Sequence, residues 1–447
     1  MMTTTFQLHD NPLLSCFTAP TLSSPTATQI VKDLEHWCQN HLTDDILAQH
    51  WEAGTFPTNC WSAFKRTCFV GYPLQNYHRL PSHNMPESDR ILLPYLLTKT
   101  LARFDASFTT AILVQYGLCA ASIAICGSNR QKEEWLPKLA SLQLCGCFGL
   151  TEPQSGSDAS QLQTTATKKN GVYVLNGSKR WIGNADMSDV LVIWARNLDL
   201  PGHPVMGFVL EKRSQPNPNC IRITKISGKT SLRMVQNANI ELVNAICPLP
   251  NVLQGNNNSD GRECIGFSQS VGRVLEASRL SVAWIPVGIC EGALQRTLNY
   301  LQERTAFGSP LTTNQLVQER LVKATSMVAS MHLMAERLTL QYHATTSTTN
   351  HGNTIGIAQI SMIKAYNSWL GRQVVSTCRE LMGGNGLVLE YGLASKVCDM
   401  EAIHTYEGTY DICTLVAGRA LTGHAAIVSG VGVQHKLKKK KSMRSKL

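Results

Sequence analysis

The chain has 447 residues, of which 43% are hydrophobic and 16% are charged. This balance excludes an intrinsically disordered protein, and the length predicts about three domains of ~150 residues each. Of the net charge of +10, seven positive charges lie in the last twelve residues. The rest of the chain is nearly balanced, so we predict that it does not bind nucleic acid.

The remaining composition argues against a membrane protein, a secreted protein and a metal protein. The longest apolar stretch, 111–126, is interrupted by Gln115 and Tyr116 and is shorter than the ~20 residues of a membrane helix, so we predict no membrane span. The first twenty residues lack the basic segment and apolar core of a secretory signal. Fifteen cysteines without a C-x-x-C pair favour a reducing compartment and argue against structural zinc.

Changes in composition divide the chain into segments. Residues 1–25 are expected to form a flexible N-terminal segment, and 26–145 are rich in Leu and Ala, which predicts a helical domain. Short β-branched and aromatic runs between turn residues predict a β domain over 146–255. Apolar residues recur every three or four positions within 263–425, which predicts a bundle of long helices. Residues 426–447 form a basic tail.

The last three residues are Ser445-Lys446-Leu447. A C-terminal S-K-L tripeptide is the address read by the peroxisomal import receptor. Chance is the alternative explanation for such a short string. We predict a location in the peroxisome matrix, with the basic residues before the tripeptide keeping it accessible.

Three strings rich in Gly and small polar residues could approach a ligand closely. L-T-E-P-Q-S-G-S-D (150–158) offers N–H groups and hydroxyls to a negatively charged ligand. In K-R-W-I-G-N, Trp181 could stack on a flat ring or could equally be a core residue. The glycines of L-M-G-G-N-G (381–386) could admit a ligand or end a helix. No strand precedes these glycines, so a Rossmann domain is not supported.

The string Y-E-G-T-Y-D (406–411) places Glu407 among aromatic residues. A desolvated carboxylate has a raised pKa and can act as a base toward a proton next to a carbonyl group. The alternative is a solvated loop glutamate. His404, three residues earlier, has no further ligands nearby in the sequence, so we predict no metal site.

Seven strings in order resemble the acyl-CoA dehydrogenase and acyl-CoA oxidase superfamily. They run from about Leu101 to Gly423 and read A-R-F-D-A-S, G-S-N-R-Q-K-E-E-W-L-P, L-T-E-P-Q-S-G-S-D, L-N-G-S-K-R-W-I-G-N, R-T-A-F-G-S-P-L, L-M-G-G-N-G and Y-E-G-T-Y-D-I. Within the superfamily the likeness is greatest to plant-type peroxisomal short-chain acyl-CoA oxidases, with glutaryl-CoA dehydrogenases a near second.

The resemblance implies a mostly α fold with a central β domain: a helical N-terminal domain, a small β-barrel-like middle domain and a C-terminal four-helix bundle. It also implies non-covalent FAD and a homo-oligomer, a dimer or tetramer, whose subunits share FAD sites. Glu407 matches the catalytic base. The residues that match substrate contacts are Ser157, Arg279, Tyr406 and Gly408.

The resemblance assigns the cofactor contacts to two groups of residues. One group would surround the flavin, with Thr151 at its ring, Trp181 and Ile182 over its face and Thr409 at the pyrophosphate. The other would reach the FAD of a neighbouring subunit. The full set is Phe148, Leu150, Thr151, Gly156, Ser157, Trp181, Ile182, Gly183, Arg304, Phe307, Gln315, Glu380, Gly383, Gly384, Thr409 and Asp411.

The implied reaction is FAD-dependent α,β-dehydrogenation of a short-chain acyl-CoA to a trans-2-enoyl-CoA, with O₂ as electron acceptor and H₂O₂ as product, in peroxisomal β-oxidation. One alternative is a dehydrogenase that uses another electron acceptor, in the manner of glutaryl-CoA dehydrogenase. Another is a non-catalytic flavin- or CoA-binding protein, against which the intact Glu407 argues.

The chain departs from its apparent relatives at several positions. Thr109 stands where glutaryl-CoA dehydrogenases carry an Arg for the distal carboxylate, Leu113 replaces a Ser and Ala102 replaces a Glu, so we expect glutaryl-CoA to be a poor substrate. Gly183 replaces a Thr or Ser and is expected to leave space at the flavin edge that eases O₂ access. Cys413 replaces a frequent Asn without a reason visible in the sequence.

Overall fold

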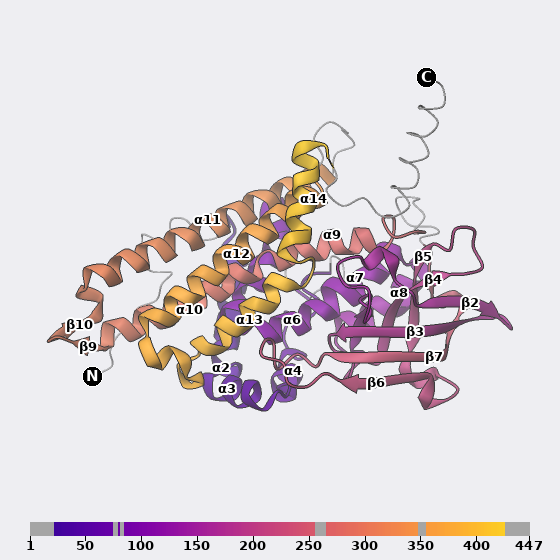
Figure 1. Ribbon diagram of the computed structural model, residues 1–447, viewed down its shortest axis with the longest axis horizontal. Coiled ribbons are helices and arrows are strands. Elements are labelled where there is room, and N and C mark those ends of the chain that lie inside the picture. Colours follow the sequence, from indigo (N-terminus) through magenta and orange to yellow (C-terminus); the bar gives the residue numbers. More distant parts are fainter. Residues whose placement is uncertain (1–21, 75–78, 81–84, 255–264, 347–354, 425–447) are drawn as a thin grey trace, which may run out of the picture.

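The computed structural model describes residues 22–74, 79–80, 85–254, 265–346 and 355–424. In Figure 1 the sheet lies at one end of the molecule and the long C-terminal helices extend toward the other, with N-terminal helices between them. The predicted fold class, mostly α with a central β domain, is confirmed. The tail and its C-terminal tripeptide lie outside the described residues.

The N-terminal domain is helical. Ser24 caps its first described helix by accepting from Ala27 N, and Ser128 and Gln131 form a reciprocal cap at its last. The helices are α2 (Pro25–His41), α3 (Asp44–Ala53), α4 (Thr58–Phe64), α5 (Glu87–Phe104), α6 (Ala106–Leu113), the π-helix η2 (Val114–Ala120), α7 (Ala121–Cys126) and α8 (Asn129–Ala140).

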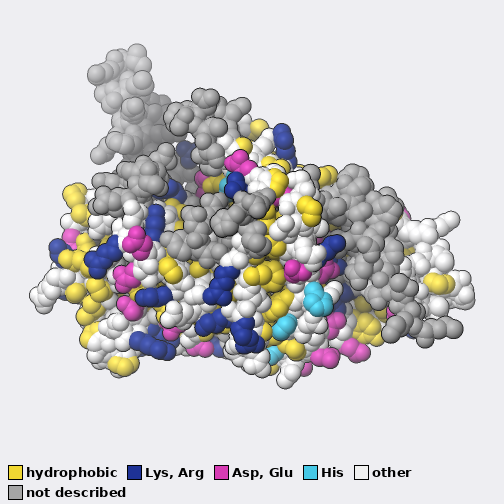
Figure 2. All heavy atoms as spheres, turned by 180° about the vertical axis from the view of Figure 1, so that it is seen from behind, with side chains coloured by type: hydrophobic (Ala, Val, Ile, Leu, Met, Phe, Trp, Pro, Cys, Tyr) yellow, Lys and Arg dark blue, Asp and Glu magenta, His cyan; other side chains and the backbone are white. Residues whose placement is uncertain are grey.

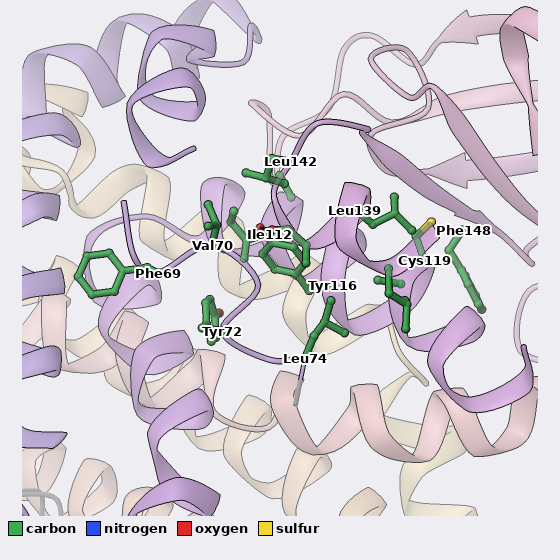
Figure 3. Packing of buried hydrophobic residues seen from close by; sticks show 14 of the residues in the cluster. Phe69, Val70, Tyr72, Leu74, Ile112, Tyr116, Cys119, Leu139, Leu142 and Phe148 are labelled. Atoms are coloured by element: carbon green, nitrogen blue, oxygen red, sulfur yellow. Dashed lines mark hydrogen bonds between the residues drawn. The ribbon is translucent and has the colours of Figure 1, made fainter. Parts of the chain in front are cut away.

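The apolar stretch Ala106–Cys126 is long and apolar enough to cross a membrane, but most of it is buried inside the fold. Figure 3 shows Ile112, Tyr116 and Cys119 within a hydrophobic core that also contains Phe148 of the first strand. This burial fits a core helix, and the absence of a membrane span stays a prediction.

The polar residues inside this stretch are explained by backbone contacts. Gln115 is fully buried, donates to Leu139 O at 2.8 Å and Leu144 O at 2.9 Å, and accepts from Gly146 N at 2.6 Å. A buried amide is stable only when it is bonded in this way. Gln115 thereby fixes the π-helix against the start of the first strand.

The middle domain is one mixed sheet with strand order β6-β7-β3-β2-β4-β5-β8, and β1 pairs with β4 in parallel. Its central strands read as continuous apolar runs because they are covered on both faces. The strands are β1 (Gly146–Gly149), β2 (Thr165–Lys169), β3 (Val172–Ile182), β4 (Val190–Asn197), β5 (Val205–Glu211), β6 (Ile221–Lys225), β7 (Ala238–Pro248) and β8 (Val252–Leu253).

The C-terminal domain contains the long helices that the apolar periodicity predicts. A hairpin of two short strands joins the second and third helices. The elements are α9 (Val271–Val282), α10 (Ile285–Glu303), β9 (Thr305–Ala306), β10 (Ser309–Pro310), α11 (Gln315–Thr346), α12 (Ile357–Leu381), α13 (Leu393–Thr405) and α14 (Tyr410–Thr422).

Two glycines let the N-terminal domain pack closely on this bundle. A Cβ at Gly288 of α10 would lie 2.2 Å from Lys99 O, and a Cβ at Gly292 would lie 2.1 Å from Arg103 O. Side chains at these positions would push α5 and α10 apart. The glycines therefore fix the placement of α5, and of α6 after it, relative to the bundle.

The face seen in Figure 2 mixes Lys and Arg with Asp, Glu and hydrophobic side chains, and does not form one basic surface. This distribution agrees with the balanced charge of the chain without its tail. The absence of nucleic-acid binding stays a prediction.

Candidate active site

Glu407 lies in the short loop between α13 and α14, and its backbone is left-handed with φ +54°. Gly408 follows with φ +90°, and a Cβ there would lie 2.9 Å from Cys413 Sγ and 3.2 Å from Arg279 Nη2. A left-handed backbone is unfavourable for a glutamate and persists only where its surroundings impose it, as at active sites.

The Glu407 carboxylate is held by polar contacts from α9. Ser278 Oγ donates to Glu407 Oε2 at 2.8 Å, and Arg279 Nε donates to the main-chain oxygen of Glu407 at 2.7 Å. Burial raises the pKa of Glu407, while Arg279, Ser278 and Lys364 oppose the rise. The raised pKa is what the sequence predicts for a desolvated carboxylate, and the role of Glu407 as a base stays a prediction.

A buried serine that was not identified from the sequence contacts the predicted base. The Ser278 hydroxyl stabilises the ionised form of Glu407, so Ser278→Ala is expected to raise the pKa of Glu407 further. Because the base must be ionised, the acid limb of the pH–rate profile should move to higher pH. Ser281→Ala on the same helix serves as the control, and an acid limb that stays in place or moves to lower pH in Ser278→Ala would contradict this assignment.

Tyr406 connects the loop 406–409, called the base loop below, to the N-terminal domain. Its hydroxyl lies 3.3 Å from Thr110 Oγ1 of α6, and burial raises the pKa of Tyr406 so that it stays protonated. The substrate-binding prediction for Tyr406 is untested, but this contact places α6 beside Glu407. Thr110 was not identified from the sequence, because only the packing of α6 on the bundle brings it here.

The residues predicted to surround the flavin ring gather where β1 ends beside β3. Arg180 N donates to Thr151 O at 2.8 Å, which brings the loop after β1 next to Trp181. The Trp181 indole is 51% exposed on a left-handed backbone, with φ +63°, whereas Ile182 is buried. An exposed indole in a fixed conformation can stack on a flat ring, so the core-residue interpretation of Trp181 is wrong.

The loop after β1 is tied down by an ion pair that the sequence analysis missed. Glu152 Oε1 accepts from Lys179 Nζ at 2.8 Å and from Thr164 N at 2.9 Å, and Lys179 Nζ also donates to Leu150 O at 3.1 Å. Both charged side chains are buried. Lys179 occupies a buried position of β3, where a hydrophobic residue is usual, and this is the signal that the sequence contained.

Gly183 does not leave the open space that the sequence analysis expects. A Cβ at Gly183 would lie 3.0 Å from Val114 Cγ2 of the π-helix η2. Asn184 Nδ2 bonds to Ala111 O at 2.9 Å and holds this turn against the same stretch of helix. Val114 therefore fills the space that was expected to ease O₂ access.

The second group of predicted cofactor residues lies elsewhere in the same chain. In Figure 1 the hairpin β9–β10 lies at the end of the bundle remote from the sheet. The side chain of Phe307 is fully exposed, and Arg320 pairs with Glu380 at 3.8 Å. One chain therefore does not bring this group to Trp181. Its exposed members are Arg304, Phe307, Gln315, Glu380, Gly383 and Gly384.

Two further predicted positions lie at the start of α14. Thr409 caps this helix, its Oγ1 accepting from Ile412 N at 3.2 Å, and Asp411 is exposed in the first turn. A helix N-terminus favours a bound phosphate group. Cys413 now has a physical explanation, because its buried thiol donates to Gly408 O at 3.5 Å and fits beside a residue without a side chain.

Three domain models of one family match in order. The acyl-CoA dehydrogenase N-terminal domain matches residues 24–143, the middle domain 147–245 and the C-terminal domain 265–422. The chain belongs to the acyl-CoA dehydrogenase family. Among the described residues no three His, Cys, Asp or Glu side chains are grouped as a metal site.

Individual relatives agree with this membership. An acyl-CoA dehydrogenase of Bacillus subtilis is 31% identical over 325 residues, covering 72% of this chain and 80% of that protein. A short-chain specific acyl-CoA dehydrogenase of Megasphaera elsdenii is 29% identical, covering 74% and 82%. A glutaryl-CoA dehydrogenase of Desulfococcus multivorans is 28% identical, covering 73% and 79%.

The solved structure of a Mycobacterium smegmatis glutaryl-CoA dehydrogenase in complex with FADH2 has a TM-score of 0.80 and 29% identity, and covers 93% of this chain and 99% of that one. These relatives are named dehydrogenases. The narrower likeness to plant-type peroxisomal oxidases therefore stays a prediction.

Proposed function

We propose that this acyl-CoA dehydrogenase family member oxidises short-chain acyl-CoA to trans-2-enoyl-CoA, with Glu407 as the base and O₂ as the electron acceptor. The observation that carries the proposal is the Glu407 carboxylate, held by Ser278 in a left-handed loop. The resemblance to the family assigns this residue the role of the base. The reaction type follows from the family. The short chain length and O₂ are the proposed refinements.

FAD, the predicted cofactor, is confirmed by the family membership and by the FADH2 complex of the solved relative. The chain's own residues fit it. Trp181 presents an exposed indole, Thr409 begins a helix of 13 residues, and the buried Asn184 Oδ1 has no hydrogen-bond partner among the described residues. The indole suits the flat flavin ring, the helix start suits the pyrophosphate, and the free amide oxygen suits a polar edge of the ring.

The chain supplies the acid–base chemistry. Glu407 removes the α proton of the thioester, whose acidity rises as negative charge moves onto the carbonyl oxygen. The N–H of Glu407 has no acceptor among the described residues and is available to that oxygen, which is worth ~3 kcal/mol for one well-placed donor. Bound FAD would supply the acceptor for the hydride that leaves the β carbon.

Helix α6, which contacts Tyr406 through Thr110, favours an uncharged acyl chain. Thr109 is buried, and its hydroxyl donates to Asp105 O at 2.6 Å at the start of α6. A hydroxyl carries no positive charge, so Thr109 cannot pair with the distal carboxylate of a substrate. Arg103, in the preceding helix, donates to Glu35 Oε1 at 3.0 Å. A buried carboxylate without a cation is costly, which supports short, uncharged acyl-CoA over glutaryl-CoA.

We further propose that O₂ accepts the electrons, that the protein acts in the peroxisome matrix, and that Ser445-Lys446-Leu447 binds the import receptor. The support is that tripeptide, which lies outside the described residues.

The names of the relatives favour a second candidate, a dehydrogenase with another electron acceptor. The exposed second group of cofactor residues supports a homo-oligomer that completes the FAD sites.

We expect purified, yellow protein to produce H₂O₂ steadily under air with butyryl-CoA or hexanoyl-CoA, and at least ~10-fold more slowly with glutaryl-CoA, because its carboxylate would be buried without a cation. A peroxide assay measures both comparisons. Reduction of the flavin by butyryl-CoA without H₂O₂ would overturn the oxidase in favour of the second candidate. Equal turnover of glutaryl-CoA and butyryl-CoA would overturn the substrate assignment.

A further inference from the structure

A fully buried lysine lies directly behind the base loop. Lys364 of α12 donates through Nζ to Gly408 O at 2.6 Å and to His404 O at 3.3 Å. Both acceptors are main-chain carbonyls of the segment that carries Glu407. Lys364 forms no ion pair with a described carboxylate, although a buried ammonium is costly without an anion.

Arg279 completes a two-cation support. Its Nε bonds to Glu407 O at 2.7 Å and its Nη1 to Ser361 Oγ of α12 at 2.9 Å. Lys364 and Arg279 therefore hold the carbonyl oxygens of consecutive residues, Gly408 and Glu407. Charge-assisted bonds of this kind are stronger than neutral ones, which is what a strained loop requires.

We propose that Lys364 is a positioning residue for Glu407: its ammonium, together with Arg279, holds the base loop in its left-handed conformation and keeps the carboxylate ionised beside bound substrate. This rests on the proposed function for the role of Glu407, and on the contacts alone for the support of the loop. The hydrogen bonds of Lys364 go to main-chain oxygens on either side of Glu407, so it acts through Glu407.

The charged and titratable groups around Lys364 come from each element packed on it. They are Arg279 of α9, His404 of α13, Cys413 of α14 and Glu407 itself. Burial lowers the pKa of Lys364 to about 8 and lowers that of His404, whereas it raises the pKa of Cys413 and of Glu407. Lys364 is thus the member of this group whose charge is lost just above neutral pH.

The chain offers a matched control. Lys396 of α13 is also buried, its pKa is also lowered to about 8, and its Nζ donates to Arg103 O at 2.9 Å and Phe104 O at 3.0 Å. It supports the junction of α5 and α6 instead of the base loop. Lys396→Met removes the same kind of group without touching the carbonyls of Glu407 and Gly408.

The decisive experiment compares Lys364→Met with Lys396→Met as holoenzymes. In the Lys364 variant we expect kcat for butyryl-CoA to fall about 10- to 100-fold with KM changed by less than about threefold, and the decline of kcat above about pH 8 to disappear. Amide hydrogen exchange of the segment 406–413, read without substrate, should become at least ~10-fold faster. The Lys396 variant should show neither change in the loop nor the loss of the alkaline decline.

Equal exchange of 406–413 in the wild type and in Lys364→Met, with the same alkaline decline, would overturn the proposal. If Lys364→Met does not fold, the wild-type holoenzyme provides the test. As the pH passes about 8, amide exchange of 406–413 should rise more steeply than that of the loop 226–237. An equal rise in the two segments would overturn the proposal. If the wild type turns over no acyl-CoA, the proposed function fails, while the exchange comparison still tests Lys364.

Discussion

Replacing Glu407 with Gln is expected to lower the rate of acyl-CoA dehydrogenation by about 10²- to 10⁴-fold, the usual contribution of a general base. Gln has nearly the same shape, and its amide oxygen can still accept from Ser278 Oγ, which lies 2.8 Å from the carboxylate. The left-handed loop, supported through its main-chain oxygens, should remain. The change therefore removes the proton acceptor and little else.

Three measurements isolate that effect. The flavin absorbance per protein should match the wild type, butyryl-CoA should still bind, and flavin reduction should be nearly abolished. Glu401→Gln is the matched control, since Glu401 lies six residues earlier, is exposed and pairs with Arg372 at 2.8 Å. A Glu407→Gln protein that retains more than about a tenth of the wild-type rate would show that another group removes the proton.

The second large effect is expected at the buried pair of Glu152 and Lys179. Lys179→Met leaves the Glu152 carboxylate buried without its cation, and breaking a buried pair from one side costs about 3–5 kcal/mol of the free energy of unfolding. The pair also holds Leu150 O and Thr164 N, so the loop carrying Thr151 should loosen. FAD should then dissociate more readily.

A double-mutant cycle tests this account. Glu152→Leu should be as costly as Lys179→Met, because it strands the ammonium, while the double variant Glu152→Leu/Lys179→Met should recover much of the lost stability. Burial alone would raise the pKa of Glu152, but Lys179 and the hydrogen bonds to the carboxylate outweigh it, and the pKa is lowered. The stability that the carboxylate contributes is therefore present above its unfolded pKa and is lost as the pH falls through its lower folded pKa. Additive losses in the double variant would contradict the coupling.

The sequence predicted the fold class and the long C-terminal helices, because both depend on local pattern. A contiguous string singled out Glu407, whose role as the base stays a prediction. The sequence did not predict Ser278, Thr110 or Lys364 as partners of the base loop, since helices far apart in the chain bring them there. Gly183 was misjudged for the same reason. Space beside a glycine depends on its neighbours, and Val114 of the π-helix fills it.

Anaerobic mixing of the wild-type holoenzyme with butyryl-CoA tests the central claim, dehydrogenation by Glu407, most directly. The account predicts rapid loss of the oxidised-flavin absorbance, formation of the enoyl-CoA in equal amount, and neither change in Glu407→Gln. A protein that holds FAD and binds butyryl-CoA and hexanoyl-CoA, yet keeps its flavin oxidised with both, would contradict it.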